Sequence, residues 1–203
     1  MLKPRNTPTE VTDLEDATVT LEDGSVRSVQ AATVEMNAGD LEQLWHPIYM
    51  ERLARTYWRY LSHITFHLIR VKYRPDGRDV VLLFKPFKLL SFLAPEYGLD
   101  VDRASVTWAI AGGLLVSKPG QGRLKISVRR IPSWEGTPVG SARIRVDVEV
   151  SNFYPAIAHR ISDHLYRWTQ SKIHVIVTMG FLRSLAKGDL TPSVVGQFEP
   201  QGE

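Results

Sequence analysis

Two histidines, His63 and His67, stand four positions apart and are the first candidates for chemistry. At this spacing they share one face of either a strand or a helix, and such a pair of imidazoles can hold a metal ion. No carboxylate or third histidine follows nearby at a supporting interval, so no metal site is expected. If this stretch is a strand and its cations from Arg70 to Arg74 point to water, alternation turns both histidines inward. Inward histidines could be hydrogen-bonded core residues or ligand contacts.

A second polar group, His159, Asp163 and His164, lies near the start of the expected C-terminal helix. A catalytic histidine and aspartate also need a nucleophile or a substrate acid within reach, and the spacing does not supply that geometry. We interpret this group as a polar helix face and predict no catalytic residue. The glycines of Gly112-Gly113 and of the run KPGQGR match no phosphate-binding pattern and are expected in turns, so no cofactor is expected.

Cations recur along the last two expected strands, in the stretches GRLKISVRR and SARIRVDVEV. The sheet face that carries these cations could contact the phosphates of a nucleic acid. Pairing these strands about a loop centred near Gly136 places Arg123 and Lys125 opposite Glu149 and Asp147. Such cross-strand pairs are ordinary decoration of a solvated sheet face, so we expect no nucleic-acid partner. Two cations at one end of the strands stay unbalanced, Arg129 and Arg143.

The totals of the sequence limit the class of protein. With 203 residues and 43% hydrophobic content, the chain suffices for one substantial domain. The net charge of +3 permits a weak attraction to a membrane surface and requires none. There is no cysteine, which excludes disulfides and fits a reducing compartment, and the N-terminus shows no apolar signal segment, so we expect a cytoplasmic protein.

The elements that must position these residues follow from the hydrophobic periodicity. A hairpin is expected at Asp23-Gly24, then a strand that stops at Gly39-Asp40, where Asp40 would cap a helix. The pair His46-Pro47 separates that short helix from a second one, which is expected to end near Ser62. From His63 onward the period is two and short turns join the strands, which predicts an antiparallel sheet.

The second expected helix interleaves aromatic residues with arginines in the stretch WHPIYMERLARTYWRYLSHI. This composition is typical of a lid or core helix, of a protein interface and of a helix on a membrane surface. Trp58 and Tyr60 fall outside its inward stripe and therefore need a partner. The inward stripe is expected to consist of Met50, Leu53, Ala54, Tyr57 and Leu61.

The chain closes with its longest helix-like pattern, over residues 152 to 188. The apolar stripe of this pattern includes Ile157 and Ile161, and a helix of this length would span ~50 Å. An ordinary small domain is shorter than that. The second half of the helix, from Ile173 to Ala186, is therefore expected to contact a partner or the N-terminal arm.

The order of these elements, with the stretches ATVEMNAGDLEQLW, SVTWAIAGGLLV and YPAIAHRI, resembles the START-like or SRPBCC superfamily, which includes the polyketide cyclase and birch-pollen-allergen families. The resemblance implies an α+β helix-grip fold, in which a curved antiparallel sheet of six to seven strands wraps around a long C-terminal helix, with two short helices after the first strand. It covers residues 28–188. An N-terminal arm with a possible hairpin (1–27) and a C-terminal tail (189–203) flank it.

The resemblance also implies an apolar cavity between sheet and terminal helix, and hence non-enzymatic binding or carriage of an apolar, lipid-like small molecule. Two alternatives stay open. The arm and the extended helix favour a structural or accessory subunit of a homo-oligomer or larger protein assembly, and the superfamily also suggests a cyclase- or hydrolase-type enzyme, although it has no strict catalytic motif to carry over. The candidate ligand-binding residues are His63, His67, Tyr73, Trp108, Ile157 and Ile161.

Overall fold

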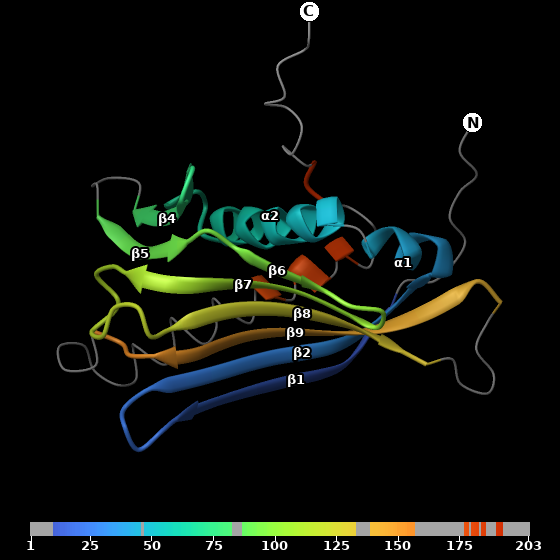
Figure 1. The fold of residues 1–203 in the computed structure, drawn as a ribbon, viewed down its shortest axis with the longest axis horizontal. Helices are drawn as coiled ribbons and strands as arrows, with labels where there is room; N and C mark the ends of the chain where they lie inside the picture. Colours follow the sequence, from blue (N-terminus) through green and yellow to red (C-terminus); the bar gives the residue numbers. More distant parts are fainter. Residues whose placement is uncertain are drawn as a thin grey trace, which may run out of the picture.

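A computed structural model of the chain describes residues 10–45, 47–82, 87–132, 139–156, 177–178, 180–182, 184–185 and 190–192. Long strands form one layer, and the helices α1 and α2 lie over one face of it (Figure 1). The predicted order of a strand, two helices and a run of strands is confirmed. The elements are β1 (Val11–Thr20), β2 (Val26–Asn37), α1 (Ala38–Leu44), α2 (Pro47–Ile64), β3 (Ile69–Arg74), β4 (Gly77–Leu82), β5 (Lys88–Leu93), β6 (Glu96–Leu99), β7 (Arg103–Gly112), β8 (Arg123–Ile131) and β9 (Ser141–Phe153).

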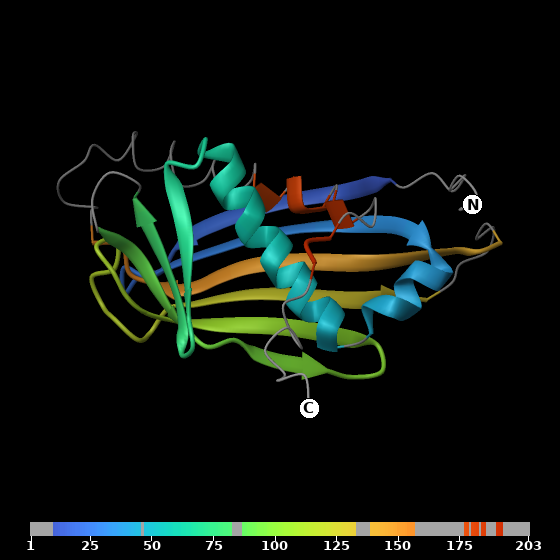
Figure 2. The ribbon, with the colours of Figure 1, turned by 90° about the horizontal axis from the view of Figure 1, so that it is seen from above.

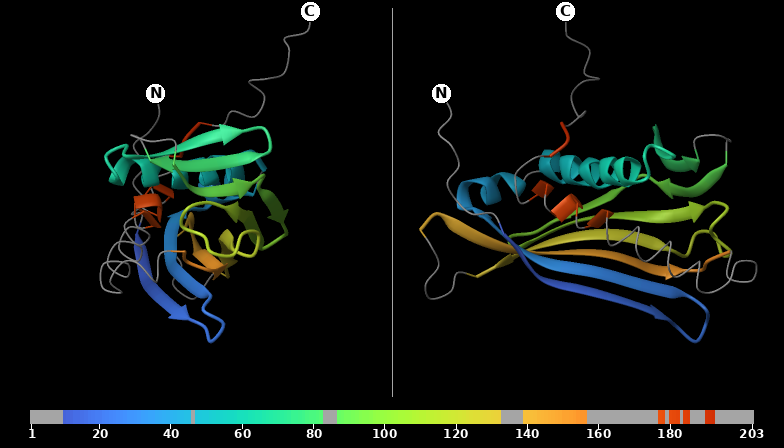
Figure 3. Two further views of the ribbon diagram at one scale, coloured as in Figure 1. Left: turned by 90° about the vertical axis from the view of Figure 1, so that its left-hand side faces the viewer. Right: turned by 180° about the vertical axis from the view of Figure 1, so that it is seen from behind.

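The described strands form one antiparallel sheet in the order β1-β2-β9-β8-β7-β5-β4-β3, and β6 also pairs with β7. The expected hairpin at Asp23-Gly24 joins β1 to β2, and Gly24 has the positive φ of 81° that such a turn requires. The sheet has nine strands rather than six or seven, because β1 adds a full edge strand and Pro95 separates β5 from β6. Figure 2 shows α2 crossing the long strands, and Figure 3 shows the sheet curving from β1 round to β4.

The two helices form much as the sequence predicts. The cap of α1 is Asn37 rather than Asp40, because the Asn37 side chain accepts a hydrogen bond of 2.8 Å from the backbone N–H of Gly39. Helix α2 begins at Pro47, as expected, and its predicted inward stripe is buried from Met50 to Tyr57. Trp58, which falls outside that stripe, is buried as well, at 3% exposure, so α2 is a core helix.

The segment from His63 to Leu68 is a helix end and a turn, not the beginning of a strand as expected. Helix α2 continues to Ile64, where the Thr65 hydroxyl donates to the Leu61 carbonyl and accepts from the Ile69 N–H. The chain then turns with positive φ at Phe66 (50°) and His67 (60°) before β3 begins at Ile69. The predicted alternation holds only from Ile69 onward, where Arg70 and Lys72 are exposed.

The C-terminal part of the chain contributes to the core. Residues 157–176 lie outside the described residues, so the predicted long helix is described only near its end, where Val177, Phe181 and Leu185 are helical and buried between α2 and the sheet (Figure 1). The expectation that this half contacts a partner or the N-terminal arm is therefore wrong for these residues. Gly180 allows the close approach, since a Cβ there would lie 2.4 Å from the Tyr60 ring.

Candidate functional site

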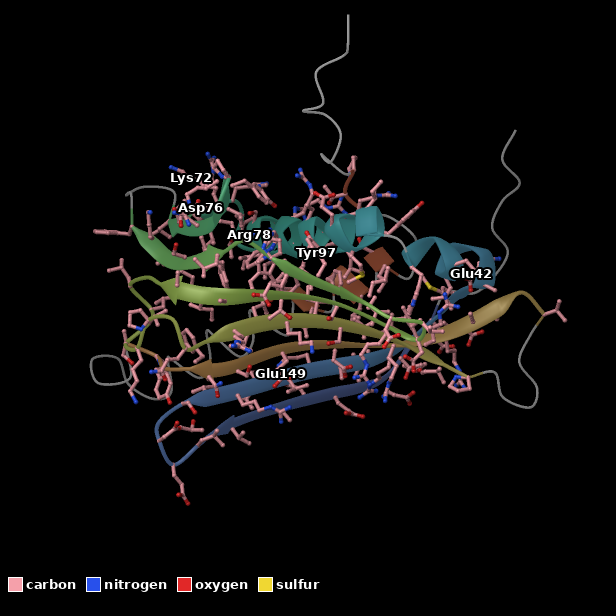
Figure 4. All side chains as sticks on the ribbon, viewed as in Figure 1. Glu42, Lys72, Asp76, Arg78, Tyr97 and Glu149 are labelled. Carbon is pink, nitrogen blue, oxygen red and sulfur yellow. The ribbon has the colours of Figure 1, made fainter. Side chains whose placement is uncertain are left out.

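The β3–β4 hairpin places Arg78 on the inner face of the sheet, below α2. Arg78 pairs with Tyr73 across the hairpin, so both side chains point to the same side as Val80. Gly77 precedes it because β5 passes so close that a Cβ would lie 2.1 Å from the Phe92 carbonyl oxygen. Figure 4 shows Arg78 and Tyr97 of β6 between α2 and the long strands.

Three aromatic rings from three elements surround the Arg78 guanidinium. Its Cζ lies 4.9 Å from the ring centroid of Trp108 on β7, 5.3 Å from Tyr73 on β3 and 5.6 Å from Trp58 on α2. The two indoles meet edge to face at 5.5 Å, and Phe92 extends the cluster. Such cation–π contacts each contribute about 0.5 to 2 kcal/mol. We call Trp58, Tyr73, Arg78 and Trp108 the Arg78 enclosure.

The Arg78 enclosure contains hydrogen-bond donors without acceptors. Arg78 is 6% exposed, and no described residue accepts from its buried Nε or Nη1. The indole Nε1 atoms of Trp58 and Trp108 are also buried, and the described residues offer no partner to either. Each unsatisfied buried donor costs about 1 to 3 kcal/mol. Four such donor nitrogens lie in one cluster with aromatic walls, and none of them has an acceptor among the described residues.

The electrostatic surroundings of Arg78 provide no counter-ion for it. Burial lowers the pKa of Arg78 from its ordinary value, while Tyr73, Tyr97 and Glu51 act in the opposite direction. Glu51 on α2 lies 3.7 Å from the Nε of Arg55 and is paired with that residue. Within the described residues no carboxylate forms an ion pair with Arg78. An arginine keeps its proton even when buried, so the enclosure holds an uncompensated positive charge.

The structure brings together two of the six predicted ligand-binding residues. Tyr73 and Trp108 both belong to the Arg78 enclosure. His63 and His67 do not: both are exposed, and their ring centroids are 6.4 Å apart beyond the end of α2. Ile157 and Ile161 lie outside the described residues, as does most of the expected wall of the cavity, which stays a prediction.

Sequence reasoning missed Arg78 and did not assign Trp58 to the site. Arg78 directly follows the turn Pro75–Gly77, so pairing the strands about that turn would have placed it opposite Tyr73, on the inner face. It was missed because an arginine at a strand end is ordinarily solvated. Trp58 was identified as a residue that needs a partner, and its partners are Trp108 and Phe92.

The arginines at the far end of β8 and β9 form a different kind of site, beside an open depression of about 680 Å³ next to α1. Arg130 donates two hydrogen bonds, of 2.6 and 3.1 Å, to the Glu42 carboxylate, which lowers the pKa of Glu42. Arg145 pairs with Glu15 of β1 at 2.6 Å. These cations are balanced by carboxylates at the surface.

The register of β8 and β9 differs from the predicted one. Arg123 lies opposite Ser151 and Lys125 opposite Glu149, and Arg129 faces Arg145. Arg123 and Lys125 therefore each face a β9 residue two positions later than predicted. The interpretation as a solvated, mixed-charge face agrees with Lys125 lying opposite Glu149.

Comparison with known proteins gives matches by structure alone. No protein-family model and no curated protein matches the chain. A crystal structure of an uncharacterised protein from Bacillus thuringiensis matches with a TM-score of 0.41 and 16% identity over 79% of this chain and 97% of that one. Norcoclaurine synthase from Thalictrum flavum matches with a TM-score of 0.39 and 14% identity over 87% and 91% of the two chains.

A third match is the lipid transfer and protein localization domain of human StarD13, with a TM-score of 0.33 and 10% identity over 84% of this chain and 88% of that one. These three likenesses have TM-scores below 0.5, and no ligand or activity passes from these proteins to this chain. Among the described residues, no helix has both the length and the apolar composition to cross a bilayer.

Proposed function

We propose that the protein binds an apolar small molecule on the inner face of its sheet, below α2, as a carrier or sensor that catalyses no reaction. The observation that carries this proposal is the Arg78 enclosure, where four buried donor nitrogens have no acceptor among the described residues. A ligand with hydrogen-bond acceptors would satisfy those donors and offset the free-energy cost of burying them. The apolar part of the ligand would pack on the aromatic rings. We propose a cytoplasmic location, which the absence of cysteine supports.

The proposed contacts combine described and undescribed parts of the chain. Tyr73 and Trp108 contribute ring faces from β3 and β7. Ile157 and Ile161 remain proposed lining residues from the C-terminal segment, whose far end packs beside α2 through Phe181. His63 and His67 do not belong to the proposed lining, because both are exposed beyond the end of α2.

An enzyme of the cyclase or hydrolase type has less support. Such a reaction needs a general acid or base beside the ligand. The histidines that could have served are exposed, and Glu51, the carboxylate near the Arg78 enclosure, is paired with Arg55.

A homo-oligomer is supported by one observation, the exposed edge strand β1. Leu14 and Val19 on it are 54% and 50% exposed. The same strand carries acidic side chains and a bulge between Thr12 and Glu15, features that oppose pairing with a second edge. Light scattering after size exclusion tests this alternative, since a monomer at all concentrations would remove its basis.

Fluorescence titration with N-phenyl-1-naphthylamine, an uncharged apolar probe, tests the proposed function. We expect saturable binding of one probe per chain, weakened by Trp108→Ala. Trp45→Phe is the matched control, because Trp45 lies outside the Arg78 enclosure and donates to the Asp100 carbonyl. A signal that rises linearly without saturation would contradict the proposal.

A further inference from the structure

We infer that the natural ligand carries an acidic group, a carboxylate or a similar singly charged oxyanion, which accepts hydrogen bonds from Arg78. This inference rests on the proposed function and names the chemical class of molecule that the same site takes. Nε and Nη1 of Arg78 are buried without an acceptor among the described residues. A planar guanidinium fork matches the two oxygens of a carboxylate better than any neutral acceptor.

None of the described carboxylates near Arg78 forms an ion pair with it, which leaves the position of its counter-ion open. Asp79, the next residue, points to the opposite face of β4, where Ser91 donates to it at 2.7 Å and Lys88 lies 3.0 Å away. Glu51 lies 3.7 Å from the Nε of Arg55 through its Oε1, and its Oε2 is buried and makes no hydrogen bond to Arg78 or to another described residue. A buried charge without a partner is costly enough that proteins ordinarily pair or neutralise it. Among the described residues no anion accepts a hydrogen bond from the Nε or Nη1 of Arg78, so we assign that position to the ligand.

The surroundings of Arg78 also define the rest of the ligand. Trp58, Tyr73 and Trp108 present rings around the guanidinium at 4.9 to 5.6 Å, so the atoms attached to the acidic group would meet aromatic walls. The indole N–H groups of the two tryptophans are further donors for an oxygen of the same molecule. These features fit an aromatic or aliphatic acid and disfavour a polyanion such as a nucleotide, which a single arginine does not balance.

Two probes with one skeleton test the inference. 1-Anilinonaphthalene-8-sulfonate is N-phenyl-1-naphthylamine with an added sulfonate, so their dissociation constants differ by the contribution of the anion. We expect the wild-type protein to bind the sulfonate about tenfold more tightly or better, as hydrogen bonds to a charged group allow. Arg78→Met removes that preference and keeps binding of the uncharged probe. Arg78→Lys keeps the charge without the fork and retains part of the preference.

The control variant is Arg70→Met, which removes an exposed arginine from the other face of the same hairpin and leaves the preference unchanged. Equal binding of the two probes by the wild-type protein would overturn the inference while the proposed function stands. A preference that survives in Arg78→Met, or disappears in Arg70→Met, would also overturn it. Saturation by neither probe would remove the proposed function, and the inference with it. If Arg78→Met does not fold, the dissociation constants of the two probes for the wild-type protein still test the inference.

Discussion

Adjacent residues of β4, Arg78 and Asp79, are both buried, at 6% and 4% exposure, and they have opposite surroundings. Asp79 faces a network in which the Ser91 hydroxyl donates at 2.7 Å and Lys88 and Arg74 lie at 3.0 and 3.5 Å. Burial raises the pKa of Asp79, and these hydrogen bonds and charges more than offset that effect, so its pKa is lowered. Arg78 has aromatic rings around its guanidinium and no ion pair among the described residues, and burial lowers its pKa.

The charge of Asp79 stabilises the fold through its partners, whereas the charge of Arg78 has no ion pair among the described residues. The Asp79 network connects β3, β4 and β5, so its carboxylate contributes to stability. Arg78 loses its hydration and has no counter-ion among the described residues, so the cost of burying its charge is offset in part by the three cation–π contacts. The surface pairs Arg130–Glu42 and Arg145–Glu15 resemble the Asp79 case, since each cation has its carboxylate.

Removing the largest ring of the Arg78 enclosure is expected to have the largest effect. Trp108 is completely buried, so Trp108→Ala should lower the free energy of unfolding by about 3 to 5 kcal/mol. Urea denaturation measures the change. Trp108→Phe, which keeps an aromatic ring, should cost clearly less, and equal losses for both variants would show that ring packing is not what Trp108 provides.

Removing the paired charge should have the next largest effect. Asp79→Ala leaves Lys88 and Arg74 without their buried carboxylate, and we expect a loss of about 2 kcal/mol in urea denaturation. Asp76, 3.7 Å from Arg74 and exposed, is the matched control, and Asp76→Ala should change stability by less than about 0.5 kcal/mol. Equal losses of stability in Asp79→Ala and Asp76→Ala would contradict the claim that the buried Asp79 network stabilises the fold.

Removing the unpaired charge should act in the opposite direction. Arg78→Met replaces a buried cation by an apolar chain of similar length, and we expect the free energy of unfolding of the ligand-free protein to rise by about 1 kcal/mol. Arg70→Met, at an exposed position, should leave it unchanged. A fall of about 1 kcal/mol or more in the free energy of unfolding of Arg78→Met would show that Arg78 stabilises the fold, as Asp79 is expected to do.

Acid should reduce the contribution of Asp79. Its pKa in the folded protein lies below the ordinary value of 3.8, so its stabilising effect is present above that pH and is lost as the pH falls through the folded-state pKa. We therefore expect the stability difference between wild type and Asp79→Asn to be constant from pH 5 to 7 and to shrink below about pH 3.8. Urea denaturation at a series of pH values checks this, and a difference that grows on acidification would contradict it.

The sequence predicts those parts of the fold that depend on local pattern. The start of α2 at Pro47, its inward stripe and the alternation from Ile69 to Lys72 all follow from periodicity and proline chemistry. The end of α2 was misplaced because a histidine-rich segment fits a helix and a strand equally well, and hydrogen bonds of Thr65 fix the helix end. The register of β8 and β9 depends on the loop between them, which periodicity does not define.

The Arg78 enclosure was only partly predictable, because its residues come from α2, β3, β4 and β7. Tyr73 and Trp108 were expected as ligand-binding residues, and the structure buries Trp108 completely but leaves Tyr73 49% exposed. Arg78 lies inside against its own solvation preference, and only the pairing of β3 with β4 and the packing of α2 across them show this. A polar residue that contradicts the pattern is where sequence reasoning is weakest and where function is best sought.

The most direct test is to observe the Nε–H group of Arg78 by nuclear magnetic resonance, with the signal assigned by its absence in Arg78→Met. On addition of 1-anilinonaphthalene-8-sulfonate to the wild-type protein, we predict that this resonance moves downfield and exchanges more slowly with water, because the proton gains an anionic acceptor. N-phenyl-1-naphthylamine should leave it nearly unmoved. A resonance that stays in place while the sulfonate probe saturates the protein would contradict the account.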